Sequence, residues 1–181
     1  IPELVTLKMR ALQGDPSLTE IEKARLTLVA PYNLDAWDGY AAEREALYAT
    51  LRKVDKKVVV LAGDTHNAWA SDLYNQSGVH VGLELATSSV SSPGLEKYLN
   101  IPLAQLQQFE LAFRTLIDEL NYCNLNQRGY LTVHFTVQQM QANWVFVNTI
   151  KDRQYTVDHD RAYQVLVDST LNDIKAEPKI A

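Results

Sequence analysis

The chain has 181 residues, 46% of them hydrophobic, a mean hydropathy of −0.20 and a formal net charge of −5. This length allows one domain with a substantial core, and the composition is that of a globular rather than a disordered protein. The negative charge, without a compensating Lys/Arg cluster, argues against a general nucleic-acid-binding surface. No apolar stretch approaches the length of a membrane span.

The chain has a single cysteine, Cys123, so no disulfide can form within it. A lone cysteine beside Tyr122 is typical of a small buried apolar residue, and no chemical role is assigned to its thiol. Oxidising and reducing compartments both remain open.

The first segment of the chain is predicted to be helical. A helix is expected over residues 4–13, followed by the turn Gly14-Asp15-Pro16-Ser17. A capping box formed by Ser17 and Glu20 predicts a second helix that runs to about Val29. Pro31 then closes it.

A third helix is expected to follow Asp38, which is placed as its N-cap. Helical spacing of apolar residues supports it, at Tyr40, Leu47, Tyr48, Leu51 and Val54. Helix followed by a buried strand is the α/β pattern, and the apolar run of residues 58–62 predicts that strand.

Directly after this run comes Gly63-Asp64-Thr65-His66. In an α/β fold, loops at the carboxyl ends of strands are where ligand-binding groups gather. Asp64 offers a carboxylate oxygen and His66 an imidazole nitrogen, both common metal ligands. A D-x-H spacing alone is a weak signal, and an Asp capping a turn beside a His filling a cleft is the alternative.

The second half of the chain alternates strand and helix patterns. Strand periodicity is seen over residues 79–85, and a long helix is expected over 103–120. Strands over 130–137 and 144–150 predict an antiparallel hairpin. A final helix is expected over 160–174. The predicted fold class is therefore mixed α/β, without an internal domain boundary.

Four motifs occur in a fixed order. They are Asn33-Leu34-Asp35-Ala36-Trp37-Asp38-Gly39-Tyr40-Ala41-Ala42-Glu43-Arg44, Gly63-Asp64-Thr65-His66-Asn67-Ala68-Trp69, Glu84-Leu85-Ala86-Thr87-Ser88-Ser89-Val90-Ser91-Ser92-Pro93-Gly94 and Gln127-Arg128-Gly129-Tyr130-Leu131-Thr132-Val133. Together they resemble the C-terminal portion of the PhoD-like alkaline phosphatases, within the calcineurin-like metallophosphoesterase superfamily. The resemblance covers about residues 32 to 150.

This resemblance implies the C-terminal half of a two-sheet sandwich flanked by helices. The upstream motifs of the family, which carry further metal ligands, do not occur here, and the chain begins at Ile1 without an initiator Met. We therefore expect residues 1–181 to form a single partial domain of a metallophosphatase catalytic domain. Its principal partner would be the upstream N-terminal half of the same enzyme, which would cover the apolar face of the half sandwich.

The resemblance also implies a two-metal centre, with Fe3+ and Ca2+ expected and Mn2+ or Zn2+ as alternatives. By carry-over, His66 would bind the iron-like site and Asp64 the second, divalent ion. An oxygen donor at Asp64 favours a harder ion such as calcium or manganese over zinc. Both residues would act in catalysis through the metals.

Other candidates carry competing interpretations. Asn67 is a weak substrate-binding candidate: it could orient His66, hydrogen-bond a phosphate oxygen or make an Asx-type loop contact. Trp69 is expected to pack beneath the loop. His80 and Glu84 share one side of a strand and could form a polar pair near the site, although a partly exposed strand face explains them as well. For Trp37 and Asp38, packing and helix capping are favoured over catalysis.

The function predicted from the resemblance is metal-dependent hydrolysis of phosphate mono- or diesters by an alkaline phosphatase or phosphodiesterase. The alternative is a non-catalytic binding or assembly module that keeps the fold, and a mononuclear esterase or lactonase fits the loop but not the other motifs. The substrate is a phosphoester of unspecified identity, and the net charge disfavours long polyanions unless the pocket itself is positive. Family analogy implies a periplasmic or extracellular location.

Overall fold

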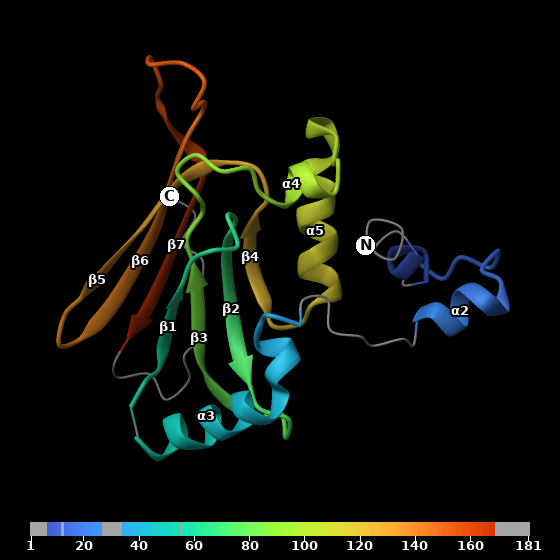
Figure 1. Ribbon diagram of the computed structural model, residues 1–181, viewed down its shortest axis with the longest axis horizontal. Coiled ribbons are helices and arrows are strands. Elements are labelled where there is room, and N and C mark those ends of the chain that lie inside the picture. Colours follow the sequence, from blue (N-terminus) through green and yellow to red (C-terminus); the bar gives the residue numbers. More distant parts are fainter. Residues whose placement is uncertain (1–6, 12, 27–33, 55, 169–181) are drawn as a thin grey trace.

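The computed structural model describes residues 7–11, 13–26, 34–54 and 56–168. Its body consists of two β-sheets that face each other, with helices against the outer face of the larger sheet and at one of its ends (Figure 1). This is the mixed α/β, two-sheet arrangement that the sequence predicted.

The larger sheet contains β1 (Val59–Ala62), β2 (Ala68–Tyr74), β3 (His80–Ala86) and β4 (Leu120–Asn124). Their order is β1-β3-β2-β4. β1 runs parallel to β3, whereas β2 is antiparallel to both β3 and β4. The predicted strands at 58–62 and 79–85 are thus confirmed, while β2 and β4 were not predicted.

The smaller sheet contains β5 (Arg128–Phe135), β6 (Gln139–Val147) and β7 (Val157–Asp168) in that order. β5 and β6 form the predicted antiparallel hairpin, with bounds shifted by two to five residues. The predicted helix over 160–174 is wrong for residues 160–168, which lie in β7 and pair with β6. Tyr163, Val165 and Val167 alternate toward the opposing sheet there, so strand pairing decides the structure. Residues 169–174 lie outside the described part.

The main core lies between the two sheets. Ala68, Ala70, Leu83 and Leu85 from the larger sheet meet Met140, Ala142, Trp144, Phe146, Val165 and Val167 from the smaller one. The indole Nε1 of Trp144 donates a hydrogen bond across this core to the Ala86 carbonyl, at 2.9 Å. Small side chains on one sheet therefore make room for large aromatic side chains on the other.

The other face of the larger sheet packs against α5 (Leu106–Leu116), which follows the short helices α4 (Leu95–Tyr98) and η2 (Leu103–Gln105) (Figure 1). The helix predicted over 103–120 is therefore shorter than expected, since Leu120 already begins β4. Glu110 of α5 is buried, and its carboxylate accepts from the Arg161 Nη2 of β7 at 2.7 and 2.6 Å. This ion pair ties the helix to the smaller sheet.

The N-terminal helices differ from the prediction in their caps. Residues 7–11 are helical, while the rest of the predicted 4–13 helix other than Gln13 lies outside the described residues. α2 spans Glu20–Leu26, and its capping box uses Thr19 and Glu22: the Glu22 amide donates to the Thr19 hydroxyl, and the Glu22 carboxylate accepts from the Thr19 amide. Ser17 and Glu20 therefore do not form the capping box, because Ser17 is bonded to Asp15 instead.

The third predicted helix is present as η1 (Trp37–Tyr40) and α3 (Ala41–Lys53). Asp38 is not its N-cap: it lies inside the 3-10 turn, and its carboxylate binds the Arg44 guanidinium at 3.1 Å. Trp37 is half exposed, so it is not packed in the core of this chain. Among the described residues, no helix is long and apolar enough to cross a membrane.

Candidate metal and phosphoester site

The D-x-H loop leaves the larger sheet where two parallel strands end together. Ala62, the last residue of β1, is paired with Ala86, the last residue of β3, and the Thr87 amide donates to the Ala62 carbonyl at 3.0 Å. The loops of residues 63–67 and 87–94 therefore start at the same edge. Both are among the four sequence motifs.

The backbone of the first loop is tightly turned. Asp64 has φ = 66° and His66 has φ = 63°, both in the left-handed region, and the Thr65 amide between them donates to the Gly63 carbonyl at 2.7 Å. A residue with a Cβ pays about 1 kcal/mol or more for this conformation. Two such residues in one loop, where glycine would be easier, point to side chains that are needed there.

His66 is held by the second loop through one ring nitrogen. Its Nδ1 lies 2.8 Å from the Pro93 carbonyl oxygen. Because a carbonyl can only accept, this contact requires the proton on Nδ1. In the neutral ring, Nε2 then carries the lone pair, and it makes no hydrogen bond within the described residues. Histidine ligands are commonly oriented in this way, with one N–H on a carbonyl and the other nitrogen on the metal.

Asp64 is exposed, and in the described part of the chain its carboxylate has no hydrogen-bond or ion-pair partner. In the second loop, Ser88 is buried, and its hydroxyl has no hydrogen-bond partner among the described groups. An exposed carboxylate and an oriented imidazole are suitable oxygen and nitrogen donors for a metal ion.

The side chain of Asn67, the weak substrate-binding candidate, is held inside the protein. It is fully buried, and its amide nitrogen donates to the carbonyls of Asn124 and Leu125, at 3.3 and 2.6 Å. Its amide oxygen accepts from the Leu95 N–H at 2.7 Å. These bonds fasten the D-x-H loop to the segment that holds His66 and to the end of β4. They support the positioning interpretation of Asn67.

Gly94 allows this arrangement. A Cβ at position 94 would lie 2.4 Å from Nδ2 and 2.7 Å from Oδ1 of Asn67. Its φ of −107° is open to any residue, so close approach of the carboxamide, rather than backbone conformation, requires glycine.

The last motif joins the same cluster. The Gly129 amide donates to the Ser89 carbonyl at 3.1 Å, and the Ser89 amide donates to the His66 carbonyl at 3.1 Å. Arg128 is buried and pairs with Glu96. Three of the four motifs, separated by up to about sixty residues in sequence, thus meet at one end of the sandwich.

The remaining candidates lie elsewhere. His80 begins β3, at the opposite end from the D-x-H loop, and its Nε2 lies 3.1 Å from Asp72. Glu84 is partly buried on the same strand, and burial raises the pKa of its carboxyl. Neither residue is brought to Asp64 and His66. Trp69 contacts the helical side, where its ring lies edge-on to Phe113.

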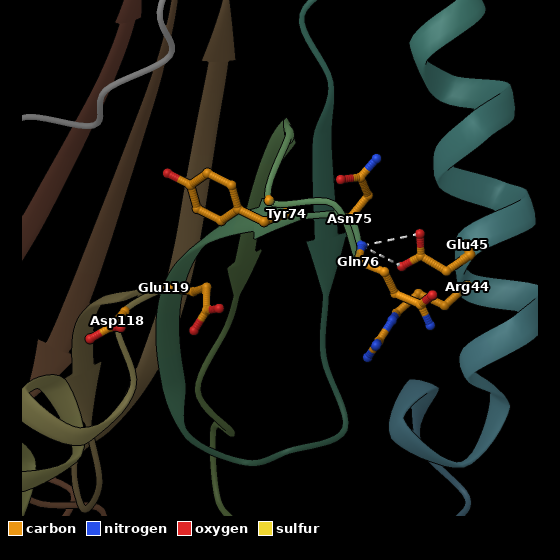
Figure 2. A pocket seen from close by; sticks show the side chains of 8 residues that line it. Arg44, Glu45, Tyr74, Asn75, Gln76, Asp118 and Glu119 are labelled. Carbon is orange, nitrogen blue, oxygen red and sulfur yellow. Dashed lines mark hydrogen bonds between the residues drawn. The ribbon is translucent and has the colours of Figure 1, made fainter.

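A hollow of about 490 Å³ lies at that opposite end, between α3, the β2–β3 turn and the start of β4 (Figure 2). Figure 2 shows Arg44 and Glu45 on the helix facing Gln76 on the turn. The backbone N–H of Gln76 donates to both Glu45 carboxylate oxygens, at 3.2 Å each. Asp118 and Glu119 add two further carboxylates. Three carboxylates against one guanidinium disfavour a phosphate, so this hollow is not the phosphoester candidate.

Within the described residues no group of three or more His, Cys, Asp or Glu side chains converges as a metal site. Asp64 and His66 could thus be members of a larger set of metal ligands, but they do not form a complete set by themselves. Sequence reasoning missed Pro93 as the group that orients His66, although Pro93 and Gly94 end the third motif. A backbone carbonyl has no sequence signature that could reveal such a contact.

The sandwich, with its D-x-H loop at the carboxyl edge of the parallel strands, is the arrangement that the resemblance to metallophosphoesterases implies. A family model described as PhoD-like phosphatase matches residues 6–144. The chain therefore belongs to the PhoD-like phosphatase family.

Two relatives support this assignment. Alkaline phosphatase D of Bacillus subtilis (strain 168) is 38% identical over 68 residues, which are 35% of this chain and 12% of that protein. A solved structure titled "Structure of PhoD" superposes with a TM-score of 0.59 at 21% identity, over 76% of this chain and 26% of that one. At this identity the structural match establishes the fold. The chain spans about an eighth to a quarter of the lengths of these relatives.

Proposed function

We propose that this chain forms the part of a phosphoester hydrolase that supplies Asp64 and His66 to its metal centre. The observation that carries the proposal is the hydrogen bond from His66 Nδ1 to the Pro93 carbonyl, because in the neutral ring it leaves Nε2 as a lone-pair donor in the loop that also carries the exposed Asp64. Membership of the PhoD-like phosphatase family supports phosphoester hydrolysis as the reaction.

The residues of this loop would have separate roles in metal binding and in positioning. His66 and Asp64 would hold two cations, with Fe3+ and Ca2+ proposed, and the Asn67 and Gly94 contacts would keep their loop in place. Such cations, when bound, polarise a phosphoryl oxygen and lower the pKa of water. The left-handed backbone at both ligand positions would be the cost of directing their side chains to one side of the edge.

The experiment compares two full-length single variants, Asp64→Asn and His66→Gln, with the unchanged protein. Metal content is measured by elemental analysis, and hydrolysis is measured with p-nitrophenyl phosphate and bis-p-nitrophenyl phosphate. We expect each change to lower metal content together with kcat/KM by about a hundredfold or more. Asparagine tolerates left-handed φ, so the first change keeps the loop conformation.

Two matched controls separate the site from the rest of the surface. Asp118→Asn alters a carboxylate of the second hollow, and His134→Gln alters an exposed histidine on β5. Both should leave metal content and hydrolysis within about twofold of the unchanged protein. Protein without metal, or site variants that hydrolyse both esters normally, would overturn the proposal and favour a binding or assembly module.

A further inference from the structure

A groove of about 590 Å³ borders the candidate site and is not explained by it. It lies between residues 91–103, which include α4, and the loop that connects β6 to β7. Pro93 lines this groove and at the same time accepts the hydrogen bond from His66. The groove therefore begins at the segment that orients the predicted metal ligand.

The charged lining of the groove is positive. Lys97 on α4 and Lys151 on the β6–β7 loop both line it and are exposed, and among the described residues neither has an ion-pair partner. Arg128 and Glu96 line it as a closed, largely buried ion pair and add no net charge. Two unpaired ammonium groups thus stand in the groove of a chain whose net charge is −5.

The rest of the lining is largely apolar. Leu103 is 76% exposed and Ile150 is 45% exposed, one on each side of the groove. Exposed apolar side chains beside two lysines suit a ligand that has an uncharged organic body and a separate anionic group. A small inorganic anion would use only the lysines.

On the basis of the proposed function, we infer that this groove is a subsite for the retained part of the substrate. Lys97 and Lys151 would bind a second phosphate of a phosphodiester, one organic unit away from the phosphate that is hydrolysed. The substrate class is then a phosphodiester whose retained group is itself phosphorylated, rather than a simple monoester. The two lysines of the groove supply the local positive charge that would attract a polyanionic substrate despite the net charge of −5 of the chain.

The test uses two esters that differ in one phosphate: thymidine 5′-(p-nitrophenyl phosphate) and the same compound phosphorylated at its 3′ hydroxyl. Full-length protein is compared with Lys97→Gln, Lys151→Gln and the double variant. Lys53→Gln is the matched control, because this exposed lysine ends α3, which precedes the amino end of β1. Release of p-nitrophenol gives kcat/KM for each ester.

We expect the 3′ phosphate to raise kcat/KM about tenfold, the size that two partly exposed charge contacts supply, with the advantage shrinking at high salt. The double variant should lose this preference while it still hydrolyses the ester without a 3′ phosphate, and Lys53→Gln should keep it. A preference that is absent from the unchanged protein, or that survives in the double variant, overturns the subsite.

Inorganic phosphate, used as an inhibitor, separates a substrate subsite from a general anion site. The double variant should be inhibited as strongly as the unchanged protein. If it instead loses that inhibition and keeps the substrate preference, the groove holds free phosphate and the inference is wrong. Failure of the unchanged protein to hydrolyse either ester would overturn the proposed function first, and the substrate subsite with it.

Discussion

At the residue scale, His66 shows how a contact between two loops fixes the orientation of a side chain. Its ring is fixed by a backbone carbonyl twenty-seven positions away, and the same loop carries Asp64 in a left-handed conformation. The sequence could suggest both residues, because carboxylate and imidazole are recognisable ligands. It could not suggest the tautomer, which depends on a carbonyl that only the fold brings into contact.

The contact with Pro93 predicts that His66 is protonated at Nδ1 and not at Nε2 when its ring is neutral. A long-range 1H–15N correlation spectrum of protein labelled at histidine distinguishes the two tautomers. His134, which is exposed on β5 and has no ring contact among the described residues, serves as the reference for a ring that is not held. An Nε2-protonated His66 would contradict the orientation on which the proposed metal role depends.

Asn67 and Gly94 should be energetically coupled. Asn67→Ala leaves two carbonyls and one N–H without their buried partner and should lower the free energy of unfolding by about 1–3 kcal/mol. Gly94→Ala should be destabilising in the unchanged background, because its Cβ would collide with the carboxamide. With Asn67→Ala present that collision disappears, so Gly94→Ala should cost less.

Urea unfolding of the two single variants and the double variant measures this coupling. Gln107→Ala, at an exposed position of α5, is the control for loss of an amide and should change stability by less than about 0.5 kcal/mol. Strict additivity of the two single changes would show that the carboxamide does not fill the space beside position 94.

Cys123 predicts how stability depends on alkaline pH. Burial, together with the Glu110 carboxylate, raises the pKa of its thiol from 9.0 to about 12. The unfolded chain therefore loses this proton above about pH 9 while the folded chain keeps it. The contribution of the protonated thiol to the free energy of unfolding is therefore fully present below about pH 9, and it is lost as the pH rises from about 9 toward 12.

Between pH 9 and 10 the slope from this group approaches about 1.4 kcal/mol per pH unit. Burial also raises the pKa of Tyr122, which adds to the loss at higher pH. Urea unfolding at a series of pH values should show the fall, and Cys123→Ala should flatten it between pH 9 and 10. An equally steep fall in that variant would mean that the thiol titrates normally in the folded protein.

At the element scale, strands with bulky alternation were predictable and strands built from small residues were not. β1, β3 and the β5–β6 hairpin carry Val, Leu, Phe or Trp at inward positions. β2 presents Ala68 and Ala70 to the core instead, because Trp144 and Phe146 fill the space opposite them. Residues 160–168 of β7 were wrongly predicted to be helical, because their strand conformation depends on pairing with β6, which the local sequence does not reveal.

The ion pair between α5 and β7 should matter more than an exposed pair. Arg161→Met leaves the buried Glu110 carboxylate with the Leu125 amide as its remaining charge-stabilising donor, and we expect a loss of about 2–3 kcal/mol. Arg44→Met breaks a pair whose aspartate is 61% exposed and should cost less than about 1 kcal/mol. Chemical denaturation measures the free energy of unfolding of both variants. Equal losses would show that the ion pair between α5 and β7 stabilises the protein no more than an exposed ion pair does. Adding Glu110→Gln to Arg161→Met should recover part of the loss.

At the scale of the whole molecule, the sandwich gathers three distant motifs at one edge. The described part of the remaining motif, residues 34–44, lies in and before α3, beside the hollow that Arg44 and Glu45 line. The order of the motifs was sufficient to suggest the family, and the family match over residues 6–144 confirms that suggestion. Two features could not be read from the sequence: the hydrogen bonds that fasten residues 63–67 to 87–95, and the groove that Lys97 and Lys151 line. Both arise where segments distant in sequence meet.

The most direct test of the metal role is anomalous X-ray diffraction from crystals of the full-length protein, recorded at the iron edge and at a longer wavelength for calcium. We expect an anomalous peak about 2.0–2.2 Å from His66 Nε2 and a second metal within about 2.6 Å of an Asp64 oxygen. Metal peaks elsewhere in the molecule, with His66 Nε2 and Asp64 contacting only water, would contradict the assignment of this loop as the metal site.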